Sequence, residues 1–294
     1  MGKLSVDIIE DNYLNKSAAA ANNLSILIGV DRFAYLVSTP DHQVLALREY
    51  ERESDISTAS KQEQKAISLP FLEKICAGDA HLGASFARIH VAWSNPFTAL
   101  VPKRLYDDEH KATYLQYLVS PEGEWTYAVD DLPHFEACNV YAIEREGLAW
   151  CQKQFPGSKL VHITTTYLSA ARNLAANPQG VRRLFVHTEI GRLRLALLDE
   201  NRLFFSNTYT YQTAKDFLYF VLALVDEFDL DQETTPVLLS GQLMEDSEIY
   251  RLLYRYFRKL SFVSCPPQIS PGAKSGALPQ HLFSDLYFLA LQTL

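Results

Sequence analysis

The stretch LFVHTEIGRLRLALLDENRLFFSNTY, residues 184–209, decides the fold, because it contains three strand-like segments in a row. Leu193, Leu195 and Leu197 alternate with polar or small residues, which is the period-two pattern of a half-buried strand. Gly191 and the segment DEN, residues 199–201, are typical of short turns between strands. The stretch therefore predicts three sequential antiparallel strands.

A second copy of this pattern, LSILIGVDRFAYLVSTPDHQVLALREYE, occupies residues 24–51. A shift of 160 positions places Leu24 on Leu184 and Arg32 on Arg192. An apolar helix pattern and a further strand follow each copy, at residues 61–78 and 87–93 after the first and at 213–230 and 235–241 after the second. The duplication predicts two similar mixed α/β domains, residues 1–180 (with an insertion at about 106–150) and residues 181–294.

The expected helices of the second copy have distinct buried faces. Thr213 followed by Asp216 has the spacing of a capping box, which predicts the start of a helix there. Its expected buried residues are Phe217, Phe220, Val221, Leu224, Val225 and Phe228. The next expected helix, residues 246–260, has its expected buried face at Ile249, Leu252, Leu253, Tyr256 and Leu260.

Composition excludes several classes of protein. The net charge of -8 and the pI near 5.5 argue against a dedicated nucleic-acid or anionic-membrane binder, because such binding needs clustered Lys and Arg. The four cysteines have no zinc-like or C-x-x-C spacing. The N-terminus lacks a secretory apolar segment, and the apolar run at residues 217–225 is too short to cross a bilayer. We expect a cytoplasmic protein without a membrane partner.

The repeated arrangement resembles the actin-like ATPase superfamily. The segments WSNPFTALVPKRLYDDEHKATYLQYL, NVYAIE, FPGSKLVHITTTYLSAA and, most specifically, NTYTYQTAKDFLYF resemble the Bacteroidetes family called domain of unknown function 3822. This resemblance implies an actin-like fold, with two RNase H-type halves around a cleft. It implies no activity, because that family has no assigned function.

In active members of the superfamily, each half begins with a strand that ends in Asp-x-Gly, followed by small or hydroxyl residues. The glycine lets backbone N–H groups approach phosphate oxygens, and the aspartate holds Mg²⁺ or water. The second copy here keeps the order with Glu189, and the first reverses it. The adenosine-side Gly-Gly is reduced to one glycine. The candidate cleft or ligand-binding residues are Gly29, Asp31, Arg32, Glu189, Gly191, Arg192, Ser240 and Gly241.

The arginine that follows each turn fills the space where the backbone would hold an anion. We therefore expect a non-catalytic binding or scaffold protein, with no catalytic residue, no metal, no cofactor and an unidentified protein partner. One alternative is a nucleotide-binding switch or kinase-like ATPase that uses ATP with Mg²⁺. Another is an RNA-associated protein that uses the basic stripe Arg251, Arg255, Arg258 and Lys259.

Two further motifs, at residues 187–189 and 272–276, are incomplete. His187 and Glu189 lie on one face of a strand and could provide two metal ligands, but no third ligand is identifiable. The segment GAKSG, residues 272–276, resembles a phosphate-binding loop but lacks its earlier glycine and its preceding strand. A Pro/Gly-rich loop before the last helix explains it better.

Overall fold

The computed structural model describes residues 2–14, 20–52, 67–119, 123–175, 180–199 and 202–292. The chain divides into two compact units. The first contains Met1–Thr166, Pro266–Leu278 and Asp285–Leu294, and the second contains Tyr167–Cys265 and Pro279–Ser284. The expected domain boundary between residues 180 and 181 stays a prediction.

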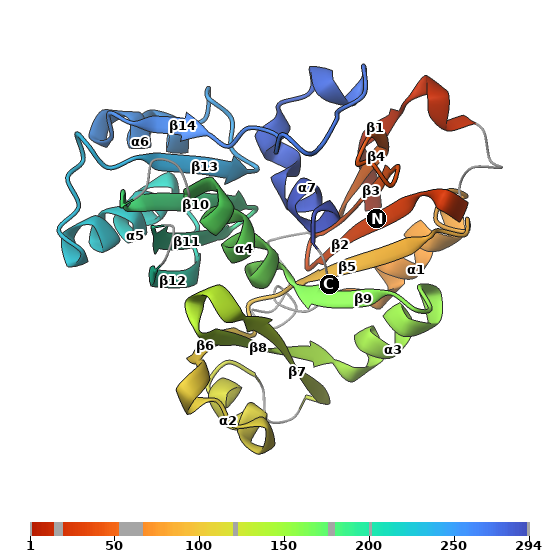
Figure 1. Ribbon diagram of the computed structural model, residues 1–294, viewed down its shortest axis with the longest axis horizontal. Helices are drawn as coiled ribbons and strands as arrows, with labels where there is room; N and C mark the ends of the chain where they lie inside the picture. Colours follow the sequence, from red (N-terminus) through yellow and green to blue (C-terminus); the bar gives the residue numbers. More distant parts are fainter. Residues whose placement is uncertain are drawn as a thin grey trace. The chain divides into compact units, whose positions relative to one another are not determined.

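A six-stranded mixed sheet forms the centre of the first unit, in the order β1-β4-β3-β2-β5-β9 (Figure 1). The first four of these strands in sheet order are antiparallel, whereas β5 and β9 run parallel to β2. The strands are β1 (Gly2–Ile9), β2 (Asn23–Gly29), β3 (Arg32–Ser38), β4 (Val44–Arg52), β5 (Arg88–Ser94) and β9 (Lys159–His162).

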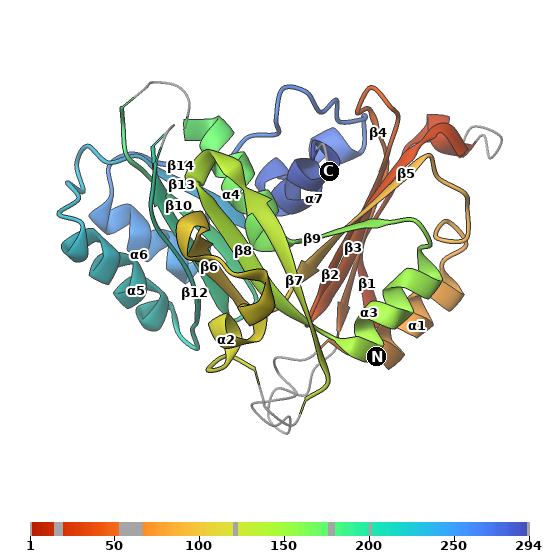
Figure 2. The ribbon, with the colours of Figure 1, turned by 60° about the horizontal axis from the view of Figure 1, so that its bottom comes forward.

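Helices cover both faces of this sheet. α1 (Leu69–Gly78) and α3 (Arg145–Gln154) lie side by side on one face (Figure 2), where Phe71 and Cys151 join a core with Ile26 and Trp93. Alternation along β2 turns Ser25 and Leu27 to the opposite face. On that face Arg32 of β3 reaches Asp285 of α7 (Ser284–Ala290), at 3.4 Å from Nη1 to Oδ2.

The first unit also contains a smaller three-stranded antiparallel sheet, in the order β6-β8-β7. Its strands are β6 (Thr98–Pro102), β7 (Trp125–Leu132) and β8 (Ala137–Glu144). Leu115 of α2 (Lys111–Leu115) is fully buried against this sheet, in a core with Phe97 and Val140. This part of the first unit therefore has a hydrophobic core of its own.

The second unit contains a five-stranded sheet in the order β12-β11-β10-β13-β14. Its strands are β10 (Arg183–Glu189), β11 (Arg192–Leu198), β12 (Leu203–Thr210), β13 (Val237–Gly241) and β14 (Leu260–Phe262). β10, β11 and β12 are antiparallel, and β13 and β14 continue in parallel. The order β4-β3-β2-β5-β9 of the first unit has the same topology, so both copies form the sheet that the repeat predicts.

The helices α5 (Ala214–Glu227) and α6 (Glu248–Tyr256) cover one face of this sheet (Figure 1). The capping box of Thr213 and Asp216 is confirmed, because each side chain accepts a hydrogen bond from the other residue's backbone N–H. Phe220 is only partly buried and stacks on Tyr209, with ring centroids 4.3 Å apart.

The expected buried face of α6 was wrong at two positions, because Tyr256 is exposed and Leu260 lies on β14 rather than on the helix. The helix ends at Tyr256, whose side chain is exposed, and the extended residue Phe257 enters the core instead. Two expectations fall partly outside the described residues: positions 61–66 of the first expected helix, and positions 200 and 201 of the second turn.

The described helices and cysteines bear on two further expectations. None of the helices within the described ranges combines the length and apolar character needed to cross a bilayer. All four cysteines lie in those ranges, and none of them forms a disulfide bond.

Candidate functional site

The turn between β10 and β11 contains the second set of candidate residues. Glu189 ends β10 and pairs across the hairpin with Arg192, the first residue of β11. Gly191 has a φ of 67°, the left-handed region that glycine adopts without a steric penalty. Its carbonyl accepts a hydrogen bond from the N–H of Tyr211, at 3.0 Å. Gly191 is therefore needed for the turn itself.

Two arginines hold the carboxylate of Glu189. Arg192 Nε lies 2.7 Å from Oε2, and Arg194 Nη1 lies 3.5 Å from Oε1. The side chains of Glu189 and Arg192 are only 10% and 12% exposed. Burial by itself would raise the pKa of Glu189, but the charges of Arg192, Arg194 and His187 outweigh it and hold that pKa well below the ordinary value. The carboxylate is therefore ionised and already neutralised by protein cations.

The neighbouring strand β13 pairs with β10 and ends beside this turn. Ser240 Oγ lies 2.9 Å from His187 Nδ1, and the N–H of Gln242 donates to the carbonyl of Thr188 at 2.7 Å. A Cβ on Gly241 would lie 2.2 Å from that same carbonyl oxygen, and the φ of Gly241 is 79°. The retained glycine thus permits close packing of β13 on β10.

Helix α4 (Ile163–Ala175) provides the remaining neighbour of this polar cluster. The centroid of the Tyr167 ring lies 5.6 Å from that of the His187 ring. The guanidinium of Arg194 lies over the Tyr167 ring, 5.9 Å from its centroid. Arg194 is only 3% exposed, although the alternation along the strand placed it on the polar face. Burial of this arginine is possible because it has both an anionic and an aromatic neighbour.

The first set of candidate residues lies at the turn between β2 and β3. Arg32 is buried, and its Nε lies 2.7 Å from Oε2 of Glu49 on β4. Its Nη1 reaches Asp285 at 3.4 Å. The carbonyl of Asp31 accepts a hydrogen bond from the N–H of Arg52 at 2.8 Å. A Cβ on Gly29 would approach the Arg32 carbonyl to 3.2 Å, so little room remains at this turn.

The structure thus brings the candidate residues together in two separate groups. Gly29, Asp31 and Arg32 share one turn of the first unit. The other group lies in the second unit, on adjacent strands: Glu189, Gly191, Arg192, Ser240 and Gly241. In each group the arginine forms an ion pair with a carboxylate of the protein, Arg32 with Glu49 and Arg192 with Glu189.

The sequence did not identify the acidic partners Glu49 and Asp285. Glu49 had a detectable signal, because it shares the inward face of β4 with the apolar Leu47. Asp285 had none, since it lies 253 residues from Arg32 in the chain.

His187 and Glu189 are the two residues that the sequence suggested as metal ligands. Their side chains are on the same face of β10, with Nε2 4.0 Å from Oε1. Among the described residues, no cluster of three or more His, Cys, Asp or Glu side chains could hold a metal ion.

The GAKSG segment binds the carboxylate of Glu10, an anion of the protein itself. The backbone N–H of Ser275 and its hydroxyl donate to Glu10 Oε1 at 2.8 Å and 2.9 Å, and the N–H of Lys274 donates at 3.1 Å. A Cβ on Gly272 would lie 2.2 Å from Glu10 Cδ. Burial raises the pKa of Glu10, yet these hydrogen bonds outweigh it and lower that pKa overall. The resemblance to a phosphate loop thus reflects a carboxylate bound by backbone donors.

The basic stripe is shorter than the sequence suggested. Arg251 and Arg255 lie on α6, but the helix ends at Tyr256, before Arg258 and Lys259. Arg258 forms an exposed ion pair with Glu233, at 3.2 Å. The prediction that all four basic residues lie along one helix was therefore wrong, because the chain becomes extended at Phe257, whose side chain enters the core.

Comparison with known structures places this architecture among actin-like folds. A Bacteroides thetaiotaomicron VPI-5482 protein with an actin-like ATPase fold and unknown function is similar over 95% of this chain and 99% of its own, with 12% identity and a TM-score of 0.76. The PilM–PilN type IV pilus biogenesis complex contains a chain that is similar over 92% of this chain and 97% of its own, with 15% identity and a TM-score of 0.60. These likenesses confirm the actin-like fold.

No functionally curated protein has significant similarity to the chain. A sequence profile does match residues 11–260, which is most of the chain, and its description is "Protein of unknown function (DUF3822)". The chain therefore belongs to the DUF3822 family.

Proposed function

We propose that this protein is a non-catalytic binding or scaffold protein on an actin-like fold, and that its partner is another protein. The observation that carries the proposal is the buried carboxylate of Glu189, which is held by Arg192 and Arg194. An acid that positions Mg²⁺ or water must be open to the ligand, whereas this one is neutralised within the turn.

The first unit supports the same reading. Arg32 is buried against Glu49 and Asp285 beside the turn that should face a phosphate. Gly241 has a role in packing, because a Cβ there would lie 2.2 Å from the carbonyl oxygen of Thr188. Among the similar structures, PilM–PilN is a complex of two proteins, which agrees with partner binding on this fold.

The direct test is the thermal response to nucleotide. A ligand present at a hundred times its dissociation constant adds roughly 2.7 kcal/mol of stability, which corresponds to roughly 3–5 °C for a chain of this size. We expect millimolar Mg-ATP to shift the melting temperature by less than about 1 °C, as AMP does at equal ionic strength. A saturable shift of several degrees with Mg-ATP and none with AMP would contradict the proposal.

The partner is tested by affinity purification of the full chain from its native cells, with and without apyrase to remove ATP. A scaffold should retain the same stoichiometric protein in both samples. Loss of that protein after apyrase treatment would favour the nucleotide-dependent switch instead.

A further inference from the structure

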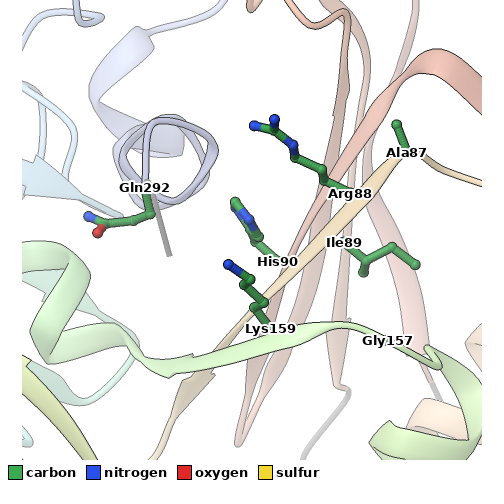
Figure 3. Close-up of a pocket in the computed structure, with 7 residues that line it drawn as sticks. All are labelled: Ala87, Arg88, Ile89, His90, Gly157, Lys159 and Gln292. Carbon is green, nitrogen blue, oxygen red and sulfur yellow. The ribbon is translucent and has the colours of Figure 1, made fainter.

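Three basic side chains converge on a pocket of about 440 Å³ in the first unit. Arg88 and His90 occupy alternate positions on β5, so they point to the same face of the sheet. Lys159 is the parallel-strand partner of His90 on β9. Figure 3 shows all three pointing toward the side of Gln292, while Ile89 points away.

The carboxylates of the described residues do not neutralise the charges in this pocket. Within the described residues, no carboxylate lies within 4 Å of the Arg88 guanidinium or the Lys159 ammonium. This differs from Arg32 and Arg192, which form buried ion pairs. Two adjacent cations repel one another, so the site favours an anion between them.

A backbone contact holds the His90 ring, and the described charged side chains that act on His90 are the cations Lys159 and Arg88. Burial lowers the pKa of His90, and the charges of Lys159 and Arg88 lower it further, while a hydrogen bond to the Leu289 backbone opposes this. His90 is therefore neutral at neutral pH in the free protein, but its ring remains held by α7.

The other elements around His90 place no unpaired carboxylate of the described residues beside it. On β2 its neighbour is the uncharged Ser25. Beyond α7, Gln292 also lines the pocket and is uncharged. The carboxylate on α7, Asp285, is paired with Arg32.

We propose that Arg88, His90 and Lys159 bind the phosphate group of a small phosphorylated molecule. The two permanent positive charges of Arg88 and Lys159 match the double negative charge of a phosphate group better than they match the single charge of a carboxylate. The molecule carries a net charge of -8, so an anion would bind only where cations are concentrated locally. The volume lies in the range of small-molecule sites and leaves space for an organic group beside the phosphate.

The first experiment measures anion binding by calorimetry at constant ionic strength, with sulfate, inorganic phosphate and glycerol 3-phosphate as probes. We expect saturable binding, weakened roughly tenfold or more in Arg88→Ala and in Lys159→Ala, because each removes a charge-assisted contact. The matched control is Lys74→Ala, an equal charge change on α1, which covers the opposite face of the sheet. Its dissociation constant should stay within about twofold of wild type.

The probes distinguish the source of the phosphate. Tighter binding of glycerol 3-phosphate than of inorganic phosphate identifies a phosphorylated molecule, as proposed. Preference for the inorganic ion would overturn that identity. Absence of saturable binding, or equal weakening in Lys74→Ala, would overturn the site itself.

The second experiment uses sulfate, which remains a dianion throughout, to follow His90. A bound dianion stabilises the protonated imidazole, so sulfate should bind more tightly as the pH falls from about 8 to about 6. In His90→Asn this pH dependence should disappear while binding at pH 8 persists. An unchanged pH dependence in this variant would show that His90 does not contact the anion.

This site is independent of the proposed function. A thermal response that Mg-ATP and AMP both produce and that disappears in Lys159→Ala would arise from this pocket, through the phosphate group that both ligands carry. A response that survives in Lys159→Ala would instead arise elsewhere and would contradict the non-catalytic scaffold.

Discussion

Replacing Arg192 with alanine tests whether the turn after β10 is filled by an ion pair. The substitution removes the 2.7 Å contact between Nε and Glu189 Oε2. It leaves the Glu189 carboxylate, of which 10% is exposed, with the longer 3.5 Å contact to Arg194. The turn itself should persist, because its geometry depends on Gly191.

The expected loss in the free energy of unfolding follows from this geometry. Breaking a buried ion pair by removing one partner costs about 3–5 kcal/mol when the other charge is left alone. Here Arg194 remains as a second counter-charge, so we expect about 2–3 kcal/mol. The matched control is Arg258→Ala, which breaks an exposed pair with Glu233 and should cost less than about 1 kcal/mol.

Urea denaturation followed by two signals assigns the loss to the correct unit. All three tryptophans, Trp93, Trp125 and Trp150, lie in the first unit, so their fluorescence reports that unit alone. Far-ultraviolet circular dichroism reports both units. Arg192→Ala should lower the midpoint of the dichroism transition more than that of the fluorescence transition.

The reasoning is refuted if Arg192→Ala costs no more than Arg258→Ala. The same conclusion follows if the substitution leaves stability unchanged and creates or removes binding of a phosphate ligand at this turn. Arg192 would then contact ligand rather than fill the site.

Three further outcomes are expected. Phe217→Ala should cost about 3–5 kcal/mol in urea denaturation, because Phe217 is fully buried, whereas the exposed Asp226→Ala should cost about 0.5 kcal/mol or less. Burial raises the pKa of Asp130 to about 6, so its contribution to stability falls as pH rises from about 4 to 6. Asp130→Asn should remove that dependence from melting curves recorded across this range. The contacts of the Glu10 carboxylate lower its pKa, so Glu10→Gln should reduce stability at pH 7. This difference in stability between wild type and variant should vanish as the pH falls below about 4. A difference that stays constant with pH would contradict the contact between the carboxylate and the loop.

The sequence predicted the two related sheets because strand and turn signals are local. Alternation in residues 184–209 and 24–51 places one face of each strand in a core, and that information lies within each segment. The capping box at Thr213 was predictable for the same reason. β1 was missed although Leu4, Val6 and Ile8 alternate, because only a short segment carries the signal.

The sequence also shows that an arginine, Arg32 or Arg192, directly follows each of the two turns. It could not predict what each arginine contacts. Glu189 was foreseeable as a neighbour three residues away, but Asp285 reaches Arg32 only because the chain returns to the first unit at its end.

The same limit applies to the two anion-binding features. The GAKSG pattern indicated backbone donors, but only tertiary structure places Glu10 among them, 265 residues from Ser275. Arg88 and His90 are close in sequence, whereas Lys159 joins them through the pairing of β5 with β9. Local periodicity determines which face of a strand a side chain occupies, while the charge that meets it depends on long-range packing, which a local pattern does not encode.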